Sequence, residues 1–410
     1  MNKLIANITI TYAASGLGFV VLILLARLLG AEQFAWVALG LALGGLIMPL
    51  ASLGSQRIFV RDAISLKDTK LVGHMADRSF GMQLTTAVLV TLLVVAGGSF
   101  YAERLEEVVA LCGFSMWVGL QGLYPTGWFD YLNETRMQNT IVLTERLAAI
   151  FFVALVYFVV EEGRIYAAFI GVVLLLTRVV SITYQVRKWK KIGGDANSKI
   201  YFKWPSSSAG GVNFRIAFTL LANSMVSYGN QVLLADTNAL ELSAYSLSFQ
   251  IITLIFLFQT LIIRLKNRKI AEVVAIGIGI RRAFFGHACV LALGSAVLGC
   301  IVFVITAYLP VVLGDDRYSL MSEFIPVLWV WIVVAGVGQA VTQYLLEMRQ
   351  EGFYTVTGIC GGILAFSTGC MFVPENGAIA VAVILLLVHG TMILTNFTYL
   401  LVLLKRGIRG

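Results

Sequence analysis

Apolar residues in this chain gather in runs of about 20 to 25, the length that an α-helix needs to cross the hydrocarbon core of a bilayer. These runs predict about twelve transmembrane helices. They are expected near residues 4–29, 34–56, 79–100, 107–128, 140–160, 165–187, 211–235, 241–264, 284–308, 322–346, 353–373 and 378–404. The first run is longer than the roughly 7 to 15 apolar residues of a cleaved signal peptide, so we expect it to be retained as a span.

One stretch of the chain occurs twice. Residues 24–36 match residues 233–245 without a gap, and Glu32 aligns with Glu241. Each copy ends one apolar run and begins the next, so each predicts a tight turn between two spans. Six predicted spans separate the copies, so both halves enter the membrane in the same direction. The pattern therefore predicts parallel repeats about an axis along the membrane normal, with a substrate path between them.

The repeat divides the chain into two predicted six-helix bundles, residues 1–190 and residues 209–410. Residues 191–208 between them form a predicted cytoplasmic linker, because this stretch is basic, contains paired glycines and Pro205, and lacks apolar periodicity. The predicted fold class is therefore an all-α polytopic membrane protein, built from two parallel six-helix bundles.

Composition and charge support this topology. Hydrophobic residues make up 59% of the chain and charged residues 13%, whereas soluble domains are about 25% charged. Of the 30 Lys and Arg residues, 26 fall on one side of the predicted membrane, which the positive-inside rule makes cytoplasmic together with both termini. The topology thus accounts for the net charge of +8, which is then no evidence for a nucleic-acid partner.

Two of the basic connections are long enough to form structure of their own. Residues 57–78 and residues 264–282 occupy equivalent places after the second and eighth predicted spans. We expect both to lie along the cytoplasmic headgroups as short amphipathic helices.

The sequence lacks the short motifs of common catalytic sites. It has no GxxxxGK phosphate loop, no HExxH zinc motif and only three histidines. Its five cysteines lie in apolar runs without CxxC spacing, which favours packing over metal binding. We therefore expect no enzymatic activity, cofactor or metal. Polar residues inside the spans are the better functional candidates, because they are costly in lipid.

The seventh predicted span has the clearest polar stripe. Its members are Arg215, Thr219, Asn223, Ser227 and Asn230, which share one face of a regular helix. A polar face with a cation at its cytoplasmic end suits a cavity that admits an anionic head group, with Arg215, Asn223 and Asn230 as binding residues. Interhelical hydrogen bonding that only packs the helix is the equal alternative.

Further basic residues lie at or near the cytoplasmic ends of spans. Arg178, in the sixth span, is a candidate for a deep cation, and its alternative is to extend along the helix toward the headgroups. Arg57, Arg61, Arg264 and Lys266 could together hold a diphosphate, since arginine binds phosphate through two parallel hydrogen bonds. The alternative for these four is that they only set the topology.

Arg27 and Asp236 occupy equivalent positions of the two repeat copies and differ in sign. An ion pair between them could close an outward gate across the two halves; the alternative is that each residue caps its own helix. His389 could carry a proton within the membrane, although a lone histidine is more often only hydrogen-bonded.

The chain resembles the Wzx-type oligosaccharide-lipid flippases of the MOP (multidrug, oligosaccharidyl-lipid, polysaccharide) superfamily. The residues that carry the resemblance are Ala26–Gly30 with Glu32–Phe34, Leu53-Gly54, Arg61-Asp62, and Leu313-Gly314 with Tyr318. The six-plus-six layout extends the resemblance over the whole chain. These motifs are short and degenerate, and they indicate the superfamily more strongly than the substrate.

The resemblance implies a V-shaped pair of six-helix bundles in a bacterial cytoplasmic membrane, around a cationic cavity. It implies that undecaprenyl-diphosphate-linked oligosaccharide repeat units move by alternating access from the cytoplasmic to the periplasmic leaflet. They would feed the synthesis of O-antigen, lipopolysaccharide or capsule. The implied partners are the lipid bilayer, this lipid-linked substrate, a polysaccharide polymerase and a chain-length regulator. Only Arg215 and Arg178 are candidates for cations deep in such a cavity.

Three other classes of protein compete with this interpretation. A drug or solute antiporter of the same superfamily needs a membrane-embedded acid cluster, but Asp236 and Glu347 lie near opposite ends of their spans. Residues 73–78 resemble the loop motif that follows the second span of a major-facilitator transporter. The basic residues that should follow this motif are missing. A polymerase or ligase of surface sugars would require a large outward loop, and no predicted outward loop exceeds roughly a dozen residues.

Overall fold

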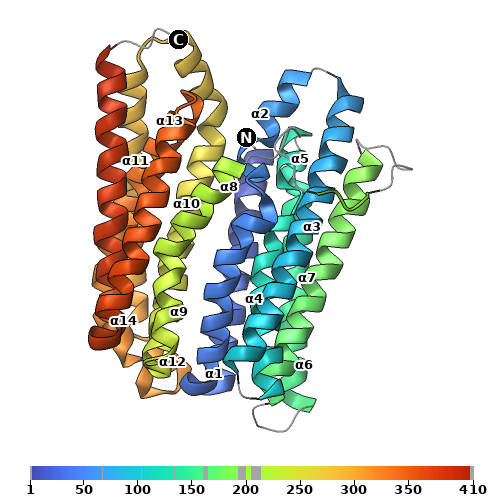
Figure 1. Ribbon diagram of the computed structural model, residues 1–410, viewed down its shortest axis with the longest axis vertical. Helices are drawn as coiled ribbons and strands as arrows, with labels where there is room; N and C mark the ends of the chain where they lie inside the picture. Colours follow the sequence, from blue (N-terminus) through green and yellow to red (C-terminus); the bar gives the residue numbers. More distant parts are fainter. Residues whose placement is uncertain are drawn as a thin grey trace. The chain divides into compact units, whose positions relative to one another are not determined.

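The computed structural model describes most of the chain (Figure 1). The described residues are 2–66, 68–102, 104–132, 134–159, 165–192, 200–204 and 214–406. These residues form helices and short connections, and none of them lies in a β-strand. The all-α fold class predicted from the apolar runs is confirmed.

The chain divides into two compact units, Met1–Ser224 and Met225–Gly410. The helices of unit 1 are α1 (Asn2–Ser52), α2 (Ser55–Leu66), α3 (Thr69–Tyr101), α4 (Leu105–Gly119), η1 (Leu120–Leu123), α5 (Thr126–Tyr131), α6 (Thr135–Val159), α7 (Ile165–Ile192) and α8 (Phe214–Ser224). Those of unit 2 are η2 (Met225–Gly229), α9 (Asn230–Ala235), α10 (Ala239–Ile276), α11 (Ile280–Thr306), α12 (Leu309–Leu313), η3 (Asp316–Leu320), α13 (Met321–Glu347) and α14 (Glu351–Arg406). The predicted linker, residues 191–208, lies mostly outside the described residues, and the predicted domain bounds stay a prediction.

Two helices are long enough to cross a membrane twice, and each is broken at one glycine. Helix α1 breaks at Gly30, where φ is 68° and ψ is 170°. Helix α14 breaks at Gly377, where φ is 59° and ψ is −146°. Glycine reaches this backbone region without the steric penalty of a Cβ. The two breaks therefore fall at turns that the apolar runs predicted, after residue 29 and after residue 373.

The number of spans agrees with the expectation. Within the described residues, nine helices are long and apolar enough to cross a membrane, and two of them are the double-length α1 and α14. One more span is the interrupted helix 214–235, made of α8, the π-helical η2 and α9. The protein is thus a multi-pass membrane protein, and its helices fit about twelve crossings.

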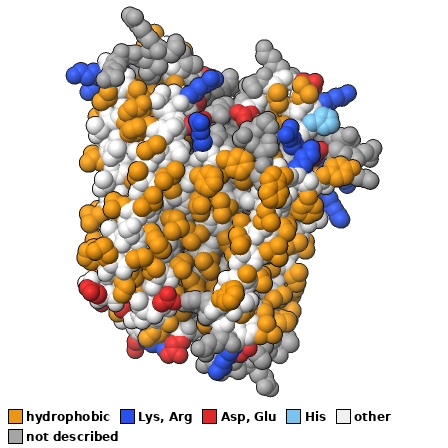
Figure 2. Space-filling model, viewed as in Figure 1, with side chains coloured by type: hydrophobic (Ala, Val, Ile, Leu, Met, Phe, Trp, Pro, Cys, Tyr) orange, Lys and Arg blue, Asp and Glu red, His pale blue; other side chains and the backbone are white. Residues whose placement is uncertain are grey.

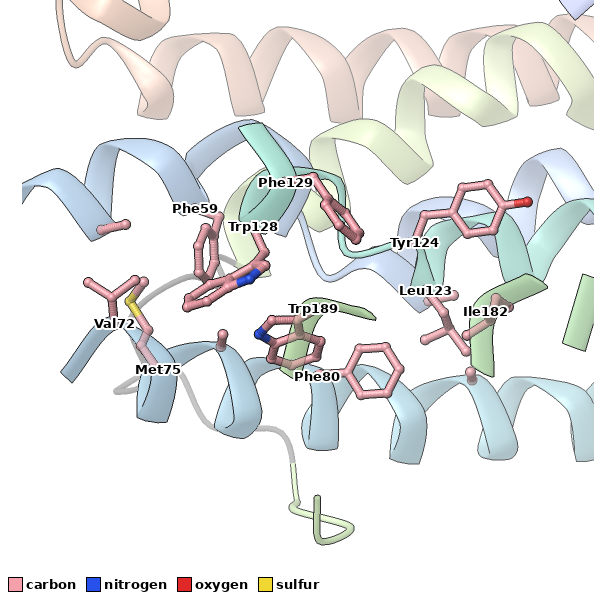
Figure 3. Close-up of a cluster of buried hydrophobic side chains, with 14 residues drawn as sticks. Phe59, Val72, Met75, Phe80, Leu123, Tyr124, Trp128, Phe129, Ile182 and Trp189 are labelled. Carbon is pink, nitrogen blue, oxygen red and sulfur yellow. The ribbon is translucent and has the colours of Figure 1, made fainter. Parts of the chain in front are cut away.

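A cluster of aromatic side chains packs the core of unit 1 (Figure 3). The ring of Trp128, in α5, lies 6.0 Å from Phe59 of α2 and 5.7 Å from Trp189 of α7, centre to centre. Trp189 in turn lies 5.7 Å from Phe80 of α3. Aromatic pairs at these separations add to the free energy gained by burial. Helix α2 is therefore held to the bundle by a buried ring.

The second basic connection folds differently from the expectation. Helix α10 continues without a break to Ile276 and ends at Gly277, which has a φ of 75°. The predicted separate amphipathic helix within 264–282 is therefore wrong, because the charged residues that end the apolar run are still good helix formers. The first connection does contain a separate short helix, α2.

Charge is distributed unevenly along the helices. On the visible face of each unit, hydrophobic side chains cover the middle and Lys and Arg side chains gather mainly toward one end (Figure 2). We call this the basic end of each unit. It holds α2, the start of α6 and the end of α7 in unit 1.

Candidate functional site

The most polar place in the interior of unit 1 joins α6, α7 and the segment before α5. Arg178 Nε of α7 lies 3.2 Å from Glu145 Oε1 of α6, and each side chain is only 1% exposed. The hydroxyl of Tyr124 accepts a hydrogen bond from Arg178 Nη1 and donates one to Glu145 Oε2. Buried charges are tolerated only where they are paired and hydrogen-bonded. These three residues interact through the ion pair and the two hydrogen bonds of Tyr124, although Arg178 Nε and Glu145 Oε1 make no hydrogen bond, and we call them the Arg178 triad.

The position of Tyr124 depends on a break in the helix that begins as α4. The α-helix ends at Gly119, continues as the 3-10 turn Leu120–Leu123, and stops before Pro125. Proline disfavours a helical conformation in the residue before it, and Tyr124 is extended, with a φ of −62° and a ψ of 127°. Figure 3 shows the Tyr124 hydroxyl pointing away from Trp128 and Trp189. The break thus turns the phenol toward α6 and α7.

A second arginine lies beside the triad. The guanidinium carbon of Arg146 is 5.1 Å from the centre of the Trp117 ring, and that of Arg178 is 5.7 Å from the same ring. An arginine over an aromatic face gains a cation–π attraction. Two guanidinium groups and the Glu145 carboxylate give this cluster an excess of one positive charge.

Helix α1 leaves room for the Arg146 side chain. A Cβ placed on Gly18 would lie 3.4 Å from Arg146 Cζ, so the guanidinium is in close reach of the α1 backbone. Among the described residues, Arg146 Nε is buried and has no hydrogen-bond acceptor. Arg146 Nε, like Arg178 Nε, is therefore a buried donor of the cluster without a hydrogen-bond acceptor.

The structure changes the interpretation of several basic residues. Arg178 is buried as a deep cation, and the alternative that it extends toward the headgroups is wrong, because its guanidinium is held by Glu145 and Tyr124. Arg146 is one of the 26 basic residues that the sequence assigns to the cytoplasmic side, but it lies about 16 Å into α6 at 1.5 Å per residue. That assignment is corrected: the apolar run 140–160 carries a Glu-Arg pair in its interior.

The predicted stripe of the seventh span does not form one regular α-helical face. The π-turn Met225–Gly229 interrupts the 3.6-residue period that the prediction assumed. Arg215 is exposed at the start of α8, and Asn223 is half-buried. Asn230 is fully buried, faces Gly369 of α14, and its amide has no hydrogen-bond partner among the described residues.

The remaining predicted residues are only partly described. The side chains of Arg57, Arg61 and Arg264 lie outside the described residues. Lys266 is half-buried on α10. Arg27 of unit 1 and Asp236 of unit 2 are both exposed, at the ends of their helices, and the gate between them stays a prediction.

Other polar groups inside the helices have local partners. Trp331 Nε1 donates to His389 Nδ1 over 2.9 Å, which agrees with the hydrogen-bonded alternative for this histidine. In the part of the chain that the structure describes, no group of three or more His, Cys, Asp or Glu side chains could hold a metal ion. A pocket of about 330 Å³ opens near the end of unit 1 opposite its basic end, and its polar lining is Glu32, Gln33, Trp36, Glu106 and Glu107.

Comparison with known proteins decides the family. The family described as polysaccharide biosynthesis protein matches residues 1–266, which is more than half of the chain. The chain belongs to this family. Comparison with curated proteins gives no match.

Solved structures show the fold. The chain is similar to the inward-facing conformation of a multidrug resistance MATE transporter of the MOP superfamily, with a TM-score of 0.66, 11% identity and 98% of each chain covered. It is similar to the eukaryotic MATE transporter AtDTX14, with a TM-score of 0.61, 13% identity, and 98% and 94% covered. A MOP superfamily transporter from Pyrococcus furiosus gives a TM-score of 0.62, 11% identity, and 98% and 96% covered. These likenesses confirm the fold that the resemblance implied.

Four residues of the cluster were missed by sequence reasoning: Trp117, Tyr124, Glu145 and Arg146. A signal for two of them was present, because Glu145 and Arg146 are adjacent charges inside an apolar run, where charges are rare. Trp117 and Tyr124 gave no such signal, since aromatic residues in spans are ordinary packing residues.

Proposed function

We propose that this protein is a flippase that moves undecaprenyl-diphosphate-linked oligosaccharide repeat units from the cytoplasmic to the periplasmic leaflet of a bacterial inner membrane, by alternating access. The single observation that carries the proposal is the buried cluster of Arg146, Arg178, Glu145, Tyr124 and Trp117, with its excess positive charge. Membership in the polysaccharide biosynthesis family supplies the class of cargo. The product is O-antigen or capsular polysaccharide.

The chemistry of the cluster suits a diphosphate. A phosphate oxygen can accept hydrogen bonds from a planar guanidinium, and such charge-assisted bonds are strong where water is excluded. Arg146 supplies the first contact, because its Nε has no acceptor in the described part of the chain, whereas the guanidinium of Arg178 is held by Glu145 and Tyr124. Arg178 keeps its pair with Glu145 and adds positive potential from behind.

The Arg178 triad holds this charge in place without a bound anion. A lone buried guanidinium would cost several kcal/mol, and the Glu145 carboxylate offsets most of that cost. The cation that remains is a single one, so the anion is attracted but can be released on the other side of the membrane. A carrier needs this balance, because a very tight site would hold its cargo.

The other predicted residues have proposed roles outside this cluster. Arg57, Arg61, Arg264 and Lys266 attract the diphosphate to the cytoplasmic entrance, and Arg215, Asn223 and Asn230 line the path. Arg27 and Asp236 form the outward gate. A polymerase and a chain-length regulator take up the translocated units, and both termini lie in the cytoplasm.

A second candidate function follows from the fold. The similar structures include multidrug transporters, so an ion-coupled drug or solute antiporter is the alternative. The excess positive charge of the cluster argues against cationic drugs as cargo, because a like charge in a low-dielectric interior repels them. We therefore favour the anionic lipid-linked substrate over this alternative, and over an enzyme of sugar assembly.

The experiment measures lipid-linked sugars by mass spectrometry in cells that lack the protein, with and without the wild type or Arg146→Ala. We expect single repeat units on undecaprenyl diphosphate to accumulate on the cytoplasmic side, together with loss of long surface polysaccharide, unless the wild type is present. Arg104→Ala is the matched control, because Arg104 is exposed at the far end of unit 1 from the cluster. Unchanged lipid-linked intermediates in the deletion would exclude the flippase.

A further inference from the structure

A long groove runs along the surface of unit 1 between α6 and α7. Its volume is about 940 Å³. The side chains that form its open walls include Leu176 and Val180 of α7, which are 58% and 68% exposed. Exposed apolar side chains on spanning helices face the hydrocarbon of the bilayer. At these two residues the groove is therefore open toward the hydrocarbon.

The groove is apolar although three threonines line it. The hydroxyls of Thr140, Thr144 and Thr177 each donate to a backbone carbonyl within their own helix, over 2.9, 3.0 and 2.7 Å. Such bonds occupy the hydroxyl proton. Glu145 also lines the groove, but its carboxylate is engaged by Arg178 and Tyr124. An apolar chain that enters the groove would therefore remove water from few free polar groups.

Only one end of the groove is charged. Glu134 and Arg136 lie there at the start of α6, and Lys188 lies there near the end of α7. Lys188 Nζ sits 5.4 Å from the centre of the Tyr184 ring, which fixes the amine beside the groove. The two cations outnumber the one carboxylate. This end fits an anionic head group attached to an apolar chain.

The length of the groove selects the kind of chain. From Arg136 to Phe152 the lining extends over 16 residues of α6, which is about 24 Å at 1.5 Å per residue. One leaflet is about 15 Å thick, half of the roughly 30 Å hydrocarbon core. A phospholipid of that leaflet fills the groove only partly. A chain of many isoprene units is long enough to fill it past the midplane.

Unit 2 contains a groove that lacks the charged end. It has a volume of about 540 Å³ and lies along both halves of α14, between Leu364 and Thr391. The side chains that line it include no Lys, Arg, Asp or Glu. Ordinary hydrocarbon can fill this groove, but nothing in its lining selects an anionic head. It provides an internal control.

We propose that the α6–α7 groove binds the polyprenyl chain of the lipid-linked substrate, with the diphosphate held by Arg136 and Lys188 at the basic end. This inference rests on the flippase function and adds the site where the carrier lipid is loaded. The bound polyprenyl chain packs against the side of Glu145 that lines the groove. Arg178 and Tyr124 bind the Glu145 carboxylate from the other side. The loaded groove therefore lies directly beside the buried cluster.

The test compares two probes on the purified full-length protein in nanodiscs, undecaprenyl diphosphate and the short geranyl diphosphate. We expect undecaprenyl diphosphate to bind at least about tenfold more tightly to the wild type. Val180→Trp, which fills the groove from an exposed position, should bring that affinity down to the geranyl level and leave geranyl diphosphate unchanged. Val383→Trp in the α14 groove is the matched control and should change neither affinity.

Several outcomes would overturn the proposal. Equal affinities of the two probes in the wild type would show that no chain-length site exists. A normal chain-length preference in Val180→Trp would place the chain elsewhere and leave the flippase function intact. Displacement of undecaprenyl diphosphate by an equal amount of phosphatidylglycerol would identify a general lipid site. Absence of binding by either probe, with Arg146→Ala also active in cells, would reject both the groove and the proposed function.

Discussion

Arg178 and Glu145 form an ion pair across α7 and α6 in which both side chains are 1% exposed. A pair this deeply buried is an unusual use of charge in a spanning bundle, because each ion alone is costly in a low-dielectric interior. Tyr124 completes the pair by hydrogen bonding to both partners. Stability and transport should therefore respond differently when one or both charges are removed.

Arg178→Ala should destabilise the protein by about 3–5 kcal/mol, because it leaves the Glu145 carboxylate buried without its cation. The double variant Arg178→Met with Glu145→Gln removes both charges and should recover most of the free energy of unfolding. It should also recover part of the transport, since Arg146 still supplies the excess positive charge of the cluster. Thermal unfolding in detergent and the lipid-linked sugar assay measure the two effects. A double variant as unstable as Arg178→Ala would contradict the pairing.

Arg146→Ala should reduce transport about tenfold or more with little change in thermal stability, because this guanidinium carries the charge left over after Glu145 and Arg178 pair. Arg146→Lys keeps the charge but loses the planar fork, so it should retain only part of the activity. Rates of surface polysaccharide recovery after induction give the comparison. Full activity in Arg146→Ala would show that the diphosphate is bound by other residues.

Glu241→Ala should destabilise unit 2 by about 1–3 kcal/mol, the usual penalty for leaving a buried donor without its acceptor. Glu241 Oε2 accepts a hydrogen bond of 2.6 Å from the Ala378 backbone N–H, next to the break at Gly377. Glu375→Ala is the control, because Glu375 is exposed on the same turn of α14. Hydrogen exchange at Ala378 provides the readout, and an unchanged rate in Glu241→Ala would reject the role of this carboxylate.

Trp128→Ala should cost about 3–5 kcal/mol, as is usual for removing a large buried aromatic ring. Helix α2 should detach first, because its residue Phe59 contacts the ring of Trp128. Limited proteolysis of the α2–α3 connection tests this expectation, with the exposed Trp204→Ala as the control. Equal protection of α2 in Trp128→Ala and the wild type would show that other contacts hold the helix.

The sequence predicted those features of the fold that depend on the length and period of apolar runs. The turns at Gly30 and Gly377 fall where two apolar runs meet. The bounds of the runs 4–29 and 378–404 could therefore be predicted without knowledge of how the helices pack. The extension of α10 to Ile276 was missed because a loss of hydrophobicity was equated with the end of a helix. The π-turn Met225–Gly229 was missed because periodic reasoning assumes 3.6 residues per turn throughout.

The candidate site was predicted less well, for a physical reason. Arg178 was recognised because a charge within an apolar run stands out on its own. Its partners were not, because pairing depends on the register between α6 and α7 and on the turn that orients Tyr124. Neither the register between the two helices nor the turn can be read from a single segment of the sequence. Glu145 and Arg146 could have been found by treating adjacent opposite charges inside a span as a buried pair rather than as loop charges.

The hydrogen bond between Glu241 and Ala378 also bears on how the chain is synthesised. Its two partners are 137 residues apart, and the repeated glutamate is made long before the last two spans leave the ribosome. Asn238 Nδ2 donates to Glu241 Oε1 over 2.9 Å, which keeps the carboxylate oriented near the start of α10. The final hairpin is therefore bound to an acceptor that lies 137 residues earlier in the chain.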